Sequence, residues 1–134
     1  MLNSARFLKS HALSNGKFGA TGFCWGGGTT NFLAATLGAE MQAGVPFYGA
    51  SADSASVPKI RSPLMIQYAE NDERINAMWP AFEAALKAAG VAHQMHMYPG
   101  TQHGFHNNST PRYHEAAAKL AWERTVAFFR QYLA

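Results

Sequence analysis

The chain has 134 residues, of which 48% are hydrophobic, and 11 Lys and Arg against 8 Asp and Glu give a formal net charge of +3. This length and composition favour a single domain, residues 1–134, and argue against a disordered chain. The basic residues are scattered singly, which does not indicate nucleic-acid binding, and the one cysteine excludes an intrachain disulfide and a multi-cysteine metal site.

The first half of the chain predicts helix, strand, helix and strand in that order. Residues 4–13 favour a short helix, and residues 17–23 favour a short strand followed by a glycine-rich turn. Residues 27–37 predict a helix of small side chains. Residues 44–48 predict a second strand, although Pro46 removes one of its hydrogen-bond donors.

The second half continues the alternation of strands and helices. Residues 51–61 are expected to form a loop, and the near-continuous apolar run 63–69 is typical of a strand covered on both faces. Residues 77–89 predict an amphipathic helix that ends at Gly90, and residues 93–98 predict a fourth strand closed by Pro-Gly.

The last predicted helix begins at Thr110-Pro111, with the threonine as N-cap and the proline in the first position. Its apolar stripe is expected to consist of Ala118, Trp122, Thr125, Phe129 and Leu133. The alternation of elements predicts an α/β fold, with a parallel sheet of about four strands flanked by helices.

One motif carries a chemical expectation. Residues 22–26 read Gly-Phe-Cys-Trp-Gly between a predicted strand and a predicted helix, which is the pattern of a nucleophile elbow with cysteine as the nucleophile. The glycines permit the tight turn, and the helix N-terminus favours a thiolate at Cys24 and a developing oxyanion near the Trp25 N–H. The alternative is a buried structural cysteine beside a glycine-rich turn.

Two later residues complete a possible triad. Asp72 follows the strand predicted at 63–69, and His103 lies on the loop after the last strand, so the order is nucleophile, acid, histidine. The carboxyl ends of parallel strands share one sheet edge, so we expect all three side chains there, with His103 as base and Asp72 orienting it. The rival acids are Asp53, Glu70 and Glu73, of which Asp53 is the strongest.

The other histidines do not form a pattern of metal ligands. His93 and His96 differ in strand parity and are expected on opposite faces. No metal site or cofactor is therefore predicted. The residues expected to line the substrate pocket are Trp25, Phe105, His106 and Asn107.

Several motifs together resemble the dienelactone hydrolase family. They are residues 22–27, Asp72 with 74–76, 98–100, 103–107, 111–113 and the closing helix with Trp122. The resemblance runs from about Ala5 to the C-terminus and implies the C-terminal half of an α/β-hydrolase fold. It implies a metal-free Cys24-Asp72-His103 triad that hydrolyses esters or lactones through a thioester acyl-enzyme.

Two departures from the family pattern qualify this reading. In the family, the elbow is preceded by the first strands of the sheet and by the loop that carries the second oxyanion N–H. The family also has an arginine shortly after the histidine, which binds a substrate carboxylate. This sequence has residues 106–108, His-Asn-Asn, at the arginine position. Without the first strands of the family fold, the strand predicted at 17–23 would have an open edge, so we expect a homodimer.

Three functional hypotheses follow from these patterns. The first is a cysteine-dependent hydrolase of small esters or lactones. The second is a catalytically weak or inactive half-domain that folds by self-association. The third is amidotransferase or peptidase chemistry, although a glutaminase would usually have Glu at the position of Phe105. We expect a cytoplasmic protein with no membrane partner, because neither a signal-peptide core nor an apolar stretch of about 18 residues is present.

Overall fold

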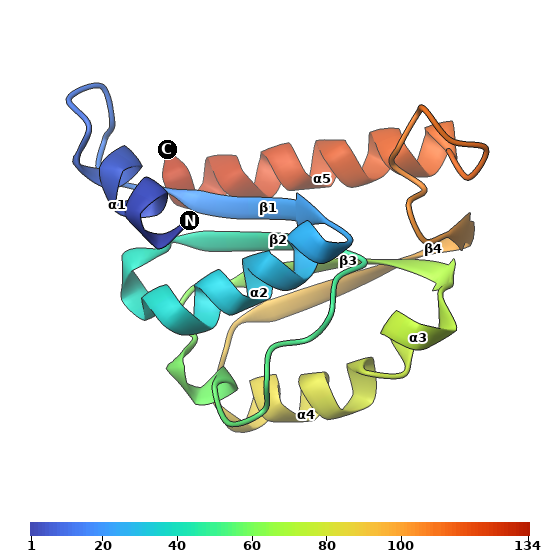
Figure 1. The fold of residues 1–134 in the computed structure, drawn as a ribbon, viewed down its shortest axis with the longest axis horizontal. Helices are drawn as coiled ribbons and strands as arrows, with labels where there is room; N and C mark the ends of the chain where they lie inside the picture. Colours follow the sequence, from blue (N-terminus) through green and yellow to red (C-terminus); the bar gives the residue numbers. More distant parts are fainter.

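The computed structural model describes residues 1–134 and contains one four-stranded sheet with helices on both faces (Figure 1). The strand order is β1-β2-β3-β4, and every neighbouring pair is parallel, which confirms the predicted α/β fold. The elements in chain order are α1 (Leu2–Ser10), β1 (Gly19–Phe23), α2 (Trp25–Leu37), the 3-10 turn η1 (Gly38–Glu40), β2 (Ala43–Phe47), the 3-10 turn η2 (Val57–Lys59), β3 (Leu64–Asn71), α3 (Glu73–Asn76), α4 (Trp79–Ala88), β4 (His93–Gln102) and α5 (Glu115–Leu133).

The sheet separates two hydrophobic layers. Helix α5 covers one face, and α2 and α4 cover the other (Figure 1). Strand β3 contributes to both layers, because Leu64 and Ile66 pack in the core with α2 and α4, whereas Met65 and Ala69 pack in the core with α5. The apolar run at 63–69 is therefore buried on both faces, as predicted.

Strand β2 is an interior strand although it contains Pro46. On either side of this proline, the Gly44 N–H donates to the Pro63 carbonyl at 3.0 Å and the Tyr48 N–H donates to the Gln67 carbonyl at 2.7 Å. These flanking bonds hold β2 against β3 without a donor at position 46. The strand predicted at 44–48 is confirmed within one residue at each end.

The predicted start of the last helix is wrong. Residues 107–113 form turns instead, in which the Asn107 carbonyl accepts from the Thr110 N–H at 3.3 Å and the Thr110 carbonyl accepts from Tyr113 at 3.1 Å. Helix α5 begins at Glu115, and the His114 side chain caps it by accepting from the Ala117 N–H at 3.3 Å. The Thr-Pro pair belongs to this turn, so its resemblance to an N-cap was misleading.

The buried face of α5 also differs from the prediction. Trp122, which was expected in the apolar stripe, is 46% exposed. Thr125 and Ala118 are buried as expected, and the residues that are buried on α5 are Ala117, Ala118, Ala121, Thr125 and Phe128. The helix thus turns a face of mainly small side chains toward the sheet, which brings it close to β2 and β3.

Strand β1 forms one edge of the sheet. The Phe18 carbonyl accepts from Gln42 and the Cys24 N–H donates to Phe47, so the even-numbered residues bond to β2. The backbone groups of Gly19, Thr21 and Phe23 alternate with them and point away from β2. The sheet therefore has an open edge at β1, next to the predicted nucleophile.

Candidate active site

The site is built around Cys24, which lies between the end of β1 and the start of α2. Its backbone has φ 56° and ψ −116°, a strained conformation for a residue with a side chain. The turn requires glycine at position 22, because a Cβ there would lie 2.3 Å from the Gly26 carbonyl oxygen. The Cys24 N–H donates to the Phe47 carbonyl at 3.1 Å and ties the turn to β2. This geometry is that of a nucleophile elbow.

The Cys24 thiol is held mainly in its neutral form. Burial raises the pKa of this thiol above its ordinary value, Arg112 and Arg74 oppose the rise, and Asp72 adds to it. The helix N-terminus was expected to favour a thiolate, but desolvation is the largest influence on the group. Nucleophilic chemistry at Cys24 therefore needs a base that removes the thiol proton.

Asp72 and His103 form a hydrogen-bonded pair at the same edge of the sheet. The His103 Nδ1 lies 2.5 Å from the Asp72 Oδ2, and Asp72 is only 8% exposed. Asp72 is anchored at the N-terminus of α3, where its carbonyl accepts from the Asn76 N–H at 2.9 Å. Because Asp72 accepts at Nδ1, the free nitrogen of the ring is Nε2, which is the arrangement that a general base requires.

The rival acids lie elsewhere or are engaged differently. The Glu70 Oε2 accepts from the Gly100 N–H at 2.7 Å, and this bond holds the end of β4 against the end of β3. Asp53 lies in the loop before η2, where its carbonyl accepts from Ser56 at 2.8 Å, and Glu73 is exposed in α3. Of the four acids, the structure pairs Asp72 with the histidine.

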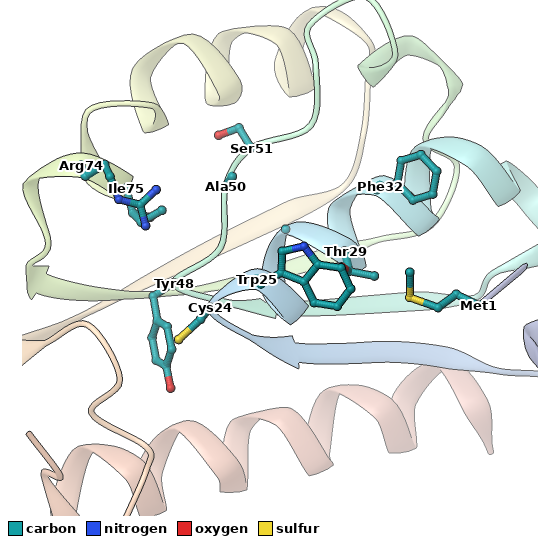
Figure 2. A pocket seen from close by; sticks show the side chains of 11 residues that line it. Met1, Cys24, Trp25, Thr29, Phe32, Tyr48, Ala50, Ser51, Arg74 and Ile75 are labelled. Atoms are coloured by element: carbon teal, nitrogen blue, oxygen red, sulfur yellow. The ribbon is translucent and has the colours of Figure 1, made fainter. Parts of the chain in front are cut away.

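Tyr48 is a site residue that the sequence analysis missed. It follows β2, has φ 33° although it is not glycine, and is buried. Its ring centroid lies 4.9 Å from that of His103, and its side chain lies beside the Cys24 sulfur in Figure 2. Burial, and after it the neighbouring Cys24, raises the pKa of Tyr48, so the hydroxyl stays protonated. The sequence does contain a signal for Tyr48, because this aromatic residue lies at the carboxyl end of the strand predicted at 44–48, at the same edge of the sheet as Cys24.

Two cavities open beside Cys24. One has a volume of about 520 Å³ and is lined mainly by apolar residues of α2 and the loop after β2 (Figure 2). The other has a volume of about 330 Å³ and is lined mainly by polar residues of the loop after β4. Cys24 and Tyr48 are the two residues that line both cavities.

The predicted pocket residues divide between these cavities, with one exception. Trp25 is 78% exposed and lines the larger cavity, whereas His106 and Asn107 line the smaller one. Phe105 is 0% exposed and packs between Tyr48 and Tyr98, so the prediction that it lines the pocket is wrong. It lies two residues after His103 in sequence, but its side chain packs in the core on the α5 side.

Arg112 was also missed as a site residue. The sequence offered no arginine directly after His103, but the turn at 107–113 brings Arg112 into the wall of the smaller cavity with Gly104 and Cys24. Its guanidinium packs near Gly104 and lowers the pKa of the Cys24 thiol. The turn geometry that brings it there is the same feature that displaced the predicted start of α5.

The remaining histidines do not join the site. The His93 Nδ1 lies 2.7 Å from the Val91 carbonyl, and His96 lies on β4, where burial and Arg124 lower its pKa. No three His, Cys, Asp or Glu side chains are arranged to hold a metal ion. None of the helices combines the length and the hydrophobicity that a membrane span requires.

The family model described as "Dienelactone hydrolase family" matches residues 2–133. The chain belongs to the dienelactone hydrolase family. A Salmonella typhi protein named "Putative carboxymethylenebutenolidase" is 33% identical over 123 residues, covering 84% of this chain and 45% of that protein. "Protein usf" of Aquifex pyrophilus is 35% identical over 135 residues, covering 97% of this chain and 58% of that protein.

The fold of this family member agrees with a solved structure. That structure, a "Putative Dienelactone Hydrolase" from Klebsiella pneumoniae, is 30% identical with a TM-score of 0.77 and covers 84% of this chain and 51% of its own. The chain spans about half the length of the curated relatives that it matches. Membership of the family supports a hydrolase.

Proposed function

We propose that this chain carries the Cys24-His103-Asp72 triad of a hydrolase that cleaves carboxylic esters or lactones. The observation that carries the proposal is the Asp72–His103 pair at 2.5 Å at the sheet edge of the strained elbow cysteine. Tyr48 links the two, because its ring lies 4.9 Å from that of His103 and lines both cavities with Cys24. Nucleophilic catalysis by a triad requires three parts, which are an orienting acid, a base with a free Nε2 and a thiol that the base can deprotonate.

The reaction follows from these parts in two steps. The His103 Nε2 takes the thiol proton while the Cys24 sulfur attacks the carbonyl carbon of the ester. The C–O bond to the alcohol then breaks, the alcohol leaves with the proton held by His103, and a thioester remains on Cys24. Water gives a proton to His103 and attacks the thioester, which releases the acid and restores the thiol.

Stabilisation of the oxyanion in these steps is supplied in part by the N-terminus of α2. Trp25 is the first residue of that helix, so its N–H has no acceptor within the helix and lies next to the attacking sulfur. A second donor is not identified among the residues around Cys24. Loss of one donor typically costs about 10²–10³ in rate.

An alternative function rests on the same observation. With a single oxyanion donor beside Cys24, the alternative is a weakly active or inactive half-domain that self-associates. The first proposal predicts ester turnover and the second predicts little or none, whereas both predict a reactive thiol. Turnover and thiol labelling measured together therefore separate them.

The test compares hydrolysis of p-nitrophenyl acetate by the wild type, Cys24→Ser and His103→Ala. The matched control is His11→Ala, which removes an exposed histidine that lines neither cavity beside Cys24. We expect both triad variants to lose turnover and the control to keep the wild-type rate. Equal rates in all four proteins would refute the hydrolase. Iodoacetamide labelling of Cys24 without turnover would favour the half-domain.

A further inference from the structure

The two cavities beside Cys24 differ in chemistry. In the larger cavity, Trp25, Gly28, Thr29 and Phe32 stand at spacings of three and four along α2, so one face of this helix forms a wall. Figure 2 shows Phe32 and Met1 at one end of this wall and Arg74 at the opposite end, near Ile75. An extended apolar group would therefore contact the face of α2 and lie directed away from Arg74.

A larger share of the residues that line the smaller cavity carries polar side chains. Its wall is formed by the loop after β4, and the side chains with polar groups there are His106, Asn107, Asn108, Thr110 and Arg112. The Asn107 side chain accepts from the N–H and the hydroxyl of Ser109, whereas the exposed Asn108 side chain makes no hydrogen bond within the protein, so its amide is available to a bound group. An apolar chain buried here would remove the hydrogen bonds that these groups make to water and would offer none in exchange.

The chemistry of the proposed reaction decides which part of the ester enters which cavity. The leaving oxygen must receive its proton from His103. Gly104, His106 and Asn107, which follow His103 in its loop, line the smaller cavity, and no residue of that loop lines the larger one. The alcohol must therefore lie on the polar side. The acyl group then lies on the α2 side, where Trp25 also presents its N–H.

We propose that the substrate is an ester with an apolar acyl chain and a small polar alcohol, which lie on opposite sides of Tyr48. The inference rests on the proposed function and names its substrate class. Phe32 is then a specificity-determining residue for the acyl chain, and Asn108 for the alcohol. A buried methylene raises kcat/KM about fourfold, and a half-buried one about twofold.

The experiment compares two isomeric esters, ethyl hexanoate and hexyl acetate, which contain the same atoms and differ in which side carries the six-carbon chain. The acyl chain of the first is four methylenes longer than that of the second. At about twofold per methylene we expect kcat/KM to be at least about tenfold higher for ethyl hexanoate. p-Nitrophenyl acetate is measured in parallel as a test of hydrolysis itself.

Two variants test the residues that form the walls. Phe32→Ala should reduce the preference for ethyl hexanoate about threefold or more, because it removes an exposed ring at the end of the acyl wall. Phe7→Ala removes a ring on α1 that is exposed to a similar degree and lines neither cavity, and should not change the preference. Asn108→Leu should raise kcat/KM for hexyl acetate more than that for ethyl hexanoate, because a leucine there offers an apolar contact to the longer alcohol chain.

The outcomes separate this inference from the proposed function. If p-nitrophenyl acetate is hydrolysed but kcat/KM for hexyl acetate equals or exceeds that for ethyl hexanoate, the proposed orientation is wrong and the proposed hydrolase activity is retained. An unchanged preference in Phe32→Ala would overturn the assignment of the acyl wall. Absence of Cys24-dependent turnover with all three esters would overturn both.

Discussion

Replacing Asp72 with asparagine tests the step on which the proposed mechanism depends. The wild-type carboxylate lies 2.5 Å from the His103 Nδ1 and is almost completely buried. In the proposed mechanism it stabilises the imidazolium that forms when Cys24 loses its proton. With charge centres about 4 Å apart and an effective dielectric constant of about 20, this attraction is worth about 4 kcal/mol. At 1.36 kcal/mol per factor of ten, its loss lowers kcat/KM by about 10³.

The assay is the hydrolysis of p-nitrophenyl acetate by Asp72→Asn, with Asp53→Asn as the control for a loop acid that does not contact His103. Urea unfolding of both variants checks that the fold is retained, because removal of one partner from a buried charged hydrogen bond also costs about 1–3 kcal/mol of stability. A loss below about threefold in Asp72→Asn, or an equal loss in Asp53→Asn, would refute the assignment of Asp72 as the orienting acid.

Three other measurable outcomes follow from the fold. Gly22→Ala should lower the free energy of unfolding by about 2–4 kcal/mol, because its Cβ would lie 2.3 Å from a backbone oxygen, whereas Gly16→Ala has open space and should cost about 1 kcal/mol; urea denaturation compares them. The lowered pKa of His96 means that the unfolded chain binds its proton more readily, so stability should fall as the pH drops below about 6.5 and level off below the folded-state pKa. His96→Gln should weaken this dependence and His11→Gln should not, and an unchanged profile in His96→Gln would contradict the assignment. The open edge of β1 should produce a dimer of the 14.6 kDa chain, and sedimentation showing a stable monomer at micromolar concentration would contradict this.

The sheet could be predicted because its strands have local sequence signals. The apolar run that became β3 is buried on both faces, and the glycine-rich turn after β1 has the spacing that an elbow requires. The positions of Cys24, Asp72 and His103 follow from the same logic, since each lies just beyond a strand of a parallel sheet. Their convergence on one edge is a consequence of topology, which the order of elements already indicates.

The errors arose where tertiary contacts overrode a local signal. Thr110-Pro111 has the chemistry of a helix start, but the Asn107 carbonyl closes a turn there and the His114 side chain caps the helix instead. Phe105 lies two residues from His103, and its ring fills a gap between Tyr48 and Tyr98 that is created only when β2, β4 and the loop assemble. Proximity in sequence could not distinguish a pocket wall from the core beneath it.

The ionisation of Cys24 shows why the sequence could not predict the properties of its own nucleophile candidate. The groups that act on the thiol are Arg112, Asp72 and Arg74, each at least 48 positions away in the chain, and they act in opposite directions. Burial outweighs the two arginines and leaves the pKa raised, so the sign depends on how closely α2, β2 and the turn at 107–113 pack around the sulfur. In the proposed mechanism, a cysteine that is neutral at rest makes His103 indispensable, because attack then requires proton transfer in the same step. The dependence of the proposed reaction on the Asp72–His103 pair would thus be a property of the packing around Cys24, which the elbow motif does not encode.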